Sequence, residues 1–202
     1  MNKSKIKKLF KEILKEGFVS NQTGEHERVI RNLFVHSGLT ESSVKKVRHE
    51  DRFQDIPNMK NGEFIFQPCG TQNSPDFIFR CDDENYYIEC KSSKGYAPTY
   101  NSGLPKPEYI YVFCSEKYNE TTIFRGCDVL TETKRKDYHS LNEKLNKVVE
   151  DHRRKEAWND NRGFDFYMRS MYTQRGGIAA GNDYFIHSER TLCENRVLEM
   201  FE

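Results

Sequence analysis

The sequence lacks a long apolar run, and this absence excludes a membrane-spanning helix from the expected elements. Near the amino terminus, Lys and Glu interrupt every apolar pair, so that region does not read as a secretory signal peptide. We therefore expect no membrane partner. The 202 residues suffice for one domain with a sizeable core but would be cramped for two.

The six cysteines form no C-x-x-C pair, so the usual signature of a zinc or redox motif is absent. Several lie inside strand-like runs, where cysteine behaves as a small apolar residue. Free thiols are typical of a reducing compartment, and we predict a cytoplasmic protein.

The net charge is only +1, so overall charge says nothing about a nucleic-acid partner. The distribution of charge is more informative. Residues 1–16, 91–107 and 134–175 are each rich in Lys and Arg, whereas the tail from Gly176 is net acidic. This asymmetry is compatible with a basic binding face. Ordinary solvated surface is the alternative for any single cluster.

The expected elements are helices first, then strands, then helices. Helical patterns cover 3–15, a second segment capped by Thr23 and ending at Gly38, a long segment 130–158, and a short one at 164–173. Strand patterns cover 63–67, 77–81, 86–89, 109–114, 121–125 and a late run in 181–187. This order predicts an α/β fold with a mixed sheet of about five strands flanked by helices.

One constellation of charged residues stands out at the ends of two strands. Glu89 and Lys91 are two residues apart in a strand, so they project from the same face. Asp76 begins the preceding strand of the same hairpin, which places its carboxylate beside Glu89. Two converging carboxylates in an apolar setting repel each other, and a divalent cation such as Mg²⁺ would relieve that cost. A salt bridge at a strand end is the alternative.

Pro75-Asp76, twelve intervening residues and then Glu89-Cys90-Lys91 resemble the PD-(D/E)XK nuclease motif. The wider string over residues 63–94 resembles type II restriction endonucleases of that superfamily. The resemblance implies a restriction-endonuclease-like core over the whole chain, with N-terminal helices in 1–60, the catalytic sheet in 61–126 and a helical, DNA-recognising part in 127–202. It also implies that Asp76 and Glu89 bind Mg²⁺, that the Cys90 carbonyl adds a ligand, and that Lys91 acts on the attacking water.

The same family often supplies an acid from an early helix. Glu27 and Glu25 are the candidates in this chain, and we include Glu27 among the catalytic residues. Both are also ordinary acids for the first turn of a helix, and that alternative stays open.

Two segments carry side chains suited to DNA contacts, either to the backbone or to base edges. The loop after Lys91 supplies one set, for which a plain surface loop is the alternative: Ser92, Ser93, Lys94, Tyr100, Asn101 and Ser102. The segment 159–175 supplies the other: Asn159, Asn161, Arg162, Arg169, Gln174 and Arg175. The apolar residues of that second segment are expected to be core: Phe164, Phe166, Tyr167 and Met171.

The sequence thus predicts a Mg²⁺-dependent endonuclease that cuts double-stranded DNA at a short specific site. A palindromic site favours a twofold homodimer, and a cognate DNA methyltransferase is the implied functional companion. The alternatives are a repair or recombination nuclease with the same core, a non-catalytic DNA-binding module, and a metal-free protein-interaction domain.

Overall fold

A computed structural model describes residues 2–20, 24–43, 59–71, 73–101, 103–155, 162–163, 166–173, 184–186 and 188–202. Its centre is a mixed sheet of six strands in the order β1-β2-β3-β4-β6-β7. The strands are β1 (Thr40–Glu41), β2 (Glu63–Phe66), β3 (Phe77–Cys81), β4 (Glu84–Ser93), β6 (Tyr109–Ser115) and β7 (Glu120–Arg125). The predicted α/β class with a mixed, helix-flanked sheet is confirmed, with six strands in place of about five.

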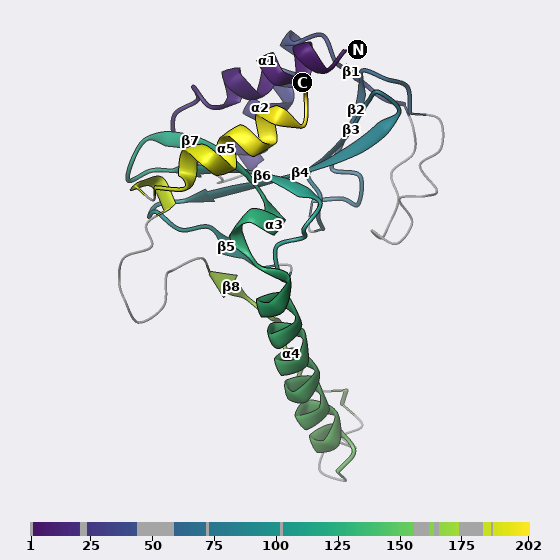
Figure 1. The fold of residues 1–202 in the computed structure, drawn as a ribbon. Helices are drawn as coiled ribbons and strands as arrows, with labels where there is room; N and C mark the ends of the chain where they lie inside the picture. The colour runs from purple at the N-terminus through teal and green to yellow at the C-terminus, as the bar shows by residue number, and fades with distance from the viewer. Residues whose placement is uncertain are drawn as a thin grey trace.

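Three helices cover one face of this sheet: α1 (Lys3–Ile13), α2 (Glu25–His36) and α5 (Arg190–Glu199). Their buried side chains meet the sheet in one cluster, in which Phe10, Phe34 and Val197 pack over Phe79 and its neighbours. The chain termini lie close together on this side, where Lys7 Nζ is 2.5 Å from Glu202 Oε1 (Figure 1). The sequence did not predict α5, because its apolar residues do not recur with a clear helical period.

Strand β4 is longer than the predicted run 86–89 because it has two different neighbours. It pairs antiparallel with β3 from Glu84 to Ile88, and parallel with β6 from Tyr87 to Ser93. The second half of β4 therefore continues past the end of β3. Glu89 and Lys91 lie in this extension, opposite Tyr111 and Phe113 of β6.

The parallel pairing of β4 with β6 forces the connection between them to run back along the sheet. Residues 94–108 make this return and contain β5 (Thr99–Tyr100). Tyr100 and Lys106 from the connection line a small cavity together with Glu89 and Lys91. The connection thus passes over the face that carries the charged residues of β4.

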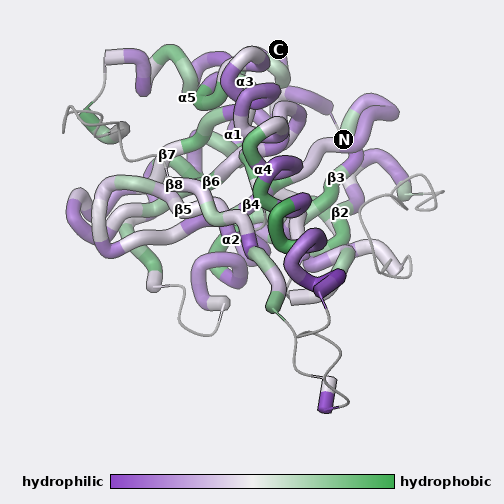
Figure 2. The backbone as a smooth tube through the Cα atoms, turned by 90° about the horizontal axis from the view of Figure 1, so that it is seen from below, coloured by the Kyte–Doolittle hydropathy of each residue, from purple (hydrophilic) through white to green (hydrophobic). Residues whose placement is uncertain are grey.

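An arm projects from that same side of the body (Figures 1 and 2). It consists of α4 (Glu132–Arg153), preceded by the short α3 (Gly126–Val129), and of the segment 166–173, which ends in β8 (Tyr172–Thr173). β8 pairs antiparallel with β5. Arg135 is the buried residue of α4, and its guanidinium donates to the carbonyl of Pro105, which anchors the base of the arm.

The chain departs from two predictions in this region. Residues 166–171 are not helical, because the segment runs alongside α4 and hydrogen-bonds to it: Ser170 Oγ donates to Asn142 Oδ1 over 2.9 Å. Tyr184–Ile186 forms a 3₁₀ turn, where a late strand was predicted, and Phe185 packs on Phe113. Among the described residues, no helix is long and apolar enough to cross a membrane.

Candidate active site

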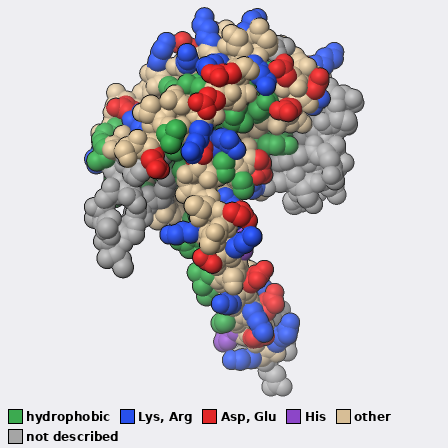
Figure 3. All heavy atoms as spheres, in the orientation of Figure 1, with side chains coloured by type: hydrophobic (Ala, Val, Ile, Leu, Met, Phe, Trp, Pro, Cys, Tyr) green, Lys and Arg blue, Asp and Glu red, His purple; other side chains and the backbone are tan. Residues whose placement is uncertain are grey.

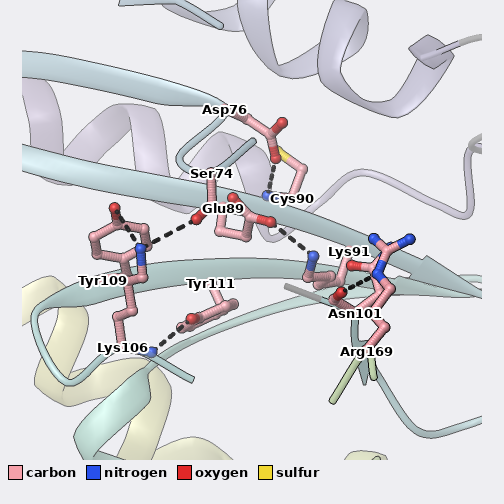
Figure 4. Close-up of polar contacts among 10 residues, drawn as sticks. All are labelled: Ser74, Asp76, Glu89, Cys90, Lys91, Asn101, Lys106, Tyr109, Tyr111 and Arg169. Carbon is pink, nitrogen blue, oxygen red and sulfur yellow. Dashed lines mark hydrogen bonds and ion pairs between the residues drawn. The ribbon is translucent and has the colours of Figure 1, made fainter. Parts of the chain in front are cut away.

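Asp76 immediately precedes β3, at the point where β4 extends beyond its pairing with that strand. Its backbone N–H donates to the carbonyl of Ile88 over 2.9 Å, which prolongs the ladder by one residue. Its side chain then bends toward β4, and Oδ2 accepts a 2.7 Å hydrogen bond from the backbone N–H of Cys90 (Figure 4). The carboxylate thus satisfies a strand N–H that β3 no longer reaches, and it is held against the charged part of β4.

Glu89 and Lys91 project from one face of β4, as their spacing predicts. Lys91 Nζ lies 2.7 Å from Glu89 Oε1, and both side chains are largely buried. The other carboxylate oxygen, Glu89 Oε2, is buried and has no hydrogen-bond partner in the part of the chain that the structure describes. Half of this carboxylate is therefore available to a further electropositive group.

Glu27 joins this group from α2. It is 8% exposed, its Oε2 is buried without a hydrogen-bond partner among the described residues, and its charge acts on both Asp76 and Glu89. Glu25 lies on the exposed side of α2 and pairs with Arg28. The helix begins after Gly24, whose φ is 75°, and not after the predicted cap Thr23, which lies outside the described residues.

Burial first, and the neighbouring carboxylates second, disfavour the charged forms of these acids. Burial raises the pKa of the Asp76 carboxyl well above its ordinary value, and the nearby charge of Glu89 adds to the rise. Burial also raises the pKa of the Glu89 carboxyl, against the opposing charge of Lys91. The two carboxylates together are therefore costly to ionise beside the single ammonium of Lys91, and a further cation would stabilise their charged forms.

A polar cleft of about 290 Å³ opens over these residues. It is lined by the four charged residues and by Cys90: Glu27, Asp76, Glu89, Cys90 and Lys91. Both predicted DNA-contact segments reach the same cleft, which is completed by Ser92, Asn101 and Arg169. The segments were predicted as separate candidates, and the pairing of β5 with β8 brings them together.

Arg169 lies at the lip of this cleft. Its Nε donates to the carbonyl of Asn101 over 2.9 Å, so the arm and the loop after β4 are joined by a side chain as well as by the strand pair (Figure 4). The hydrogen bond uses the inner nitrogen and orients the guanidinium, whose planar fork suits phosphate or guanine.

The remaining predicted DNA-contact residues are placed differently. Tyr100 is 4% exposed and packs edge-on against Tyr111, so it supports the loop from inside. Ser93, Lys94 and Arg162 do not line the cleft. Five residues lie outside the described part of the chain: Ser102, Asn159, Asn161, Gln174 and Arg175.

Several residues of the site were not singled out from the sequence. Thr71, Asn73, Thr99 and Met171 complete the cleft wall. Behind it, Lys106 Nζ donates to Ser74 Oγ over 3.3 Å, next to Glu89 (Figure 4). No local pattern marks these positions, because they come from three separate parts of the chain: the turn before β3, the return connection and the arm.

Three residues of the arm segment correct the sequence prediction. Phe166, Tyr167 and Met171 are exposed, although their apolar character predicted core positions. The segment lies on α4 at the edge of the molecule, where only one of its sides can be covered. Phe164 lies outside the described residues.

Among the described residues, no group of three or more His, Cys, Asp or Glu side chains is arranged so that it could hold a metal ion by itself. Comparison of this chain with protein-family models, curated proteins and solved structures finds no match.

Proposed function

We propose that this protein is a Mg²⁺-dependent endonuclease with a PD-(D/E)XK-like core that hydrolyses phosphodiester bonds of double-stranded DNA. The observation that carries this proposal is the convergence of Asp76, Glu89 and Lys91 on one polar cleft that also receives Arg169 and Asn101. A salt bridge at a strand end explains the contact of Glu89 with Lys91 alone. It does not explain why two further carboxylates, the buried Glu27 and the half-buried Asp76, are gathered beside that pair.

The donor set suits a hard cation. Mg²⁺ is usually bound by one or two carboxylates, with waters and substrate phosphate oxygens in the other positions, so a three-residue cage is not required. Glu89 Oε2 and the carboxylate of Asp76 would hold it, and the Cys90 carbonyl is the third candidate donor. When bound, Mg²⁺ would supply charge stabilisation for the phosphoryl oxygens and raise the acidity of water.

Lys91 and Glu27 would have different parts in the reaction. The Lys91 ammonium, at 2.7 Å from Glu89, can turn toward a water or a phosphate oxygen once a cation occupies the carboxylate. It would then stabilise negative charge that develops in the transition state. Glu27 faces the cleft from α2, and its carboxylate would orient a water molecule by accepting a hydrogen bond from it.

The arm gives the cleft a place for a long substrate. Figure 3 shows Lys and Arg side chains along the projecting helix. Lys134 and Lys136 are exposed at its base, whereas the neighbouring Arg135 is 8% exposed and bonded to Pro105. Lys134 and Lys136 would contact phosphates, while Arg169 at the cleft lip would read bases.

A restriction enzyme that cuts both strands of a palindromic site needs two copies of this cleft, which favours a homodimer. A cognate methyltransferase would then protect host DNA. A repair or recombination nuclease with the same core is the second candidate, because the cleft itself does not distinguish a sequence from a DNA structure. A non-catalytic DNA-binding module would have no use for three carboxylates that converge on one cleft.

Incubation of phage DNA with the protein and Mg²⁺, followed by electrophoresis, separates these functions. Discrete bands support a restriction enzyme, and a smear or nicking at branched DNA supports the repair nuclease. A mobility shift without cleavage supports the binding module. Absence of both cleavage and binding would overturn the proposal.

A further inference from the structure

The arm carries an apolar stripe that the body of the molecule leaves uncovered. Leu141, Leu145 and Val148 of α4 are 49%, 42% and 66% exposed. They follow one another at intervals of four and three residues, which is the spacing of the contact positions of a coiled coil. Hydrophobic side chains form a row along one edge of the projecting helix (Figure 3).

The neighbouring side of α4 is already occupied. Tyr138 packs edge-on against Tyr172 with ring centroids 5.4 Å apart, and Asn142 bonds to Ser170 and Tyr172. Farther along, Arg153 donates to the carbonyl of Phe166. The segment 166–173 therefore covers one flank of α4. The apolar stripe lies beside this covered flank and remains exposed.

We propose that this stripe binds the same stripe of a second copy, with the two α4 helices antiparallel about a twofold axis. The structure gives a reason for this partner in the charges that border the stripe. Lys144 and Asp151 lie along its open flank, one heptad apart and of opposite sign, and both are exposed. A stripe bordered by a cation and an anion at that interval is complementary to itself.

The charges also select the alignment. When Leu145 faces Val148 of the partner subunit in an antiparallel pair, each Lys144 faces the other copy's Asp151, so two ion pairs form across the axis. Shifting the helices so that Leu145 faces Leu141 sets Lys144 against Lys144. A parallel pair places Lys144 beside Val149, with no ion pair. Of these three arrangements, only the first combines an apolar contact of Leu145 with Val148 and ion pairs on the flank.

This interface deepens the proposed function, because a second copy is what a double-strand cut requires. Its own evidence is the stripe and the charges, neither of which involves the cleft. The interface is therefore tested without DNA or metal, so its failure would leave the nuclease proposal standing, and the converse also holds.

Sedimentation velocity of the whole chain over a range of concentrations, without DNA or Mg²⁺, measures the association. The wild type should sediment as a monomer–dimer equilibrium. Leu145→Lys should weaken dimerisation by about 100-fold or more, because it places two cations in the apolar contact. Val35→Lys is the matched control: Val35 is similarly exposed on α2, away from the stripe, and its change should leave the equilibrium unaltered.

Charge reversal gives the sharper test, since it leaves the apolar residues intact. Lys144→Glu alone and Asp151→Lys alone each create like-charge contacts, and each should weaken self-association by roughly tenfold. An equimolar mixture of the two single variants should dimerise as the wild type does, because both ion pairs reform between unlike copies. Higher salt should reduce these differences.

Three results would overturn the proposal. The first is a wild type that remains monomeric at every concentration. The second is a dimer that persists in Leu145→Lys, and the third is a mixture of single variants no more associated than either alone. If Leu145→Lys stays dimeric but loses DNA binding, the stripe contacts DNA and not a second copy.

Discussion

The carboxylate of Asp76 accepts a 2.7 Å hydrogen bond from the backbone N–H of Cys90, at the point where β4 extends beyond its pairing with β3. A side chain here replaces a missing strand, and in doing so it brings its charge next to Glu89. The strand end is thus both a structural boundary and the place where acidic groups converge. This arrangement explains why a buried strand ends in charged residues.

Glu27→Gln should reduce Mg²⁺-dependent cleavage by about 10- to 100-fold, the usual loss when a group that orients an active-site neighbour is neutralised. Glu25→Gln is the matched control, since it lies two residues away on the exposed side of α2 and pairs with Arg28. Initial rates on phage DNA measure both. Equal rates for the two variants would remove Glu27 from the site.

Lys91→Ala and Glu89→Ala should both stop cleavage, but for different reasons. Glu89→Ala removes a ligand, so calorimetric titration with Ca²⁺ or Mg²⁺ should show weak or absent binding. Lys91→Ala removes the ammonium that competes for Glu89 Oε1, so metal affinity should be kept or increased. A Lys91→Ala protein with normal cleavage would make Lys91 a salt-bridge partner only.

Replacement of Lys134 and Lys136 by Gln should weaken binding to all DNA alike and flatten its salt dependence, because fewer counterions are released. Arg169→Ala should instead reduce the preference for fragments that contain the cleavage site over fragments that lack it. The loss in discrimination free energy should be about 1–3 kcal/mol, the value of a bidentate base contact. Competition binding at two salt concentrations measures both effects. Parallel losses in every variant would show that Arg169 does not read bases.

Arg135 lies between Lys134 and Lys136 in the sequence, but it is buried, whereas the two lysines are exposed. Arg135→Ala should lower the free energy of unfolding by about 1–3 kcal/mol, since it leaves the Pro105 carbonyl without this donor and removes buried packing. Lys136→Ala is the exposed control and should change stability by less than about 0.5 kcal/mol. Chemical denaturation compares them.

The sequence was most informative where contacts are local. The strands Phe77–Cys81 and Tyr109–Ser115 follow from short runs of mostly apolar residues, and the shared face of Glu89 and Lys91 follows from strand geometry. The convergence of Asp76 with them follows from the hairpin. These inferences need only the spacing of neighbours along the chain.

Long-range pairing was out of reach of that reasoning. Arg169 reaches the cleft because β8 pairs with β5 across some seventy residues, and no periodic pattern marks either two-residue strand. Phe166 and Met171 look like core residues because apolar character alone does not show which side of an arm faces solvent. The choice between Glu25 and Glu27 likewise required the orientation of α2 against the sheet.

The most direct test of the central claim compares the wild type with Asp76→Asn on phage DNA in the presence and absence of Mg²⁺. The exchange keeps the shape and an acceptor for the Cys90 N–H but removes the charge. The wild type is expected to cleave the DNA only when Mg²⁺ is present, and Asp76→Asn is expected not to cleave it at all. The variant should still bind DNA in the presence of Ca²⁺. The account also predicts that the variant's thermal stability is unchanged or higher, since a crowded carboxylate is lost. Cleavage by Asp76→Asn at a rate near that of the wild type would contradict the account.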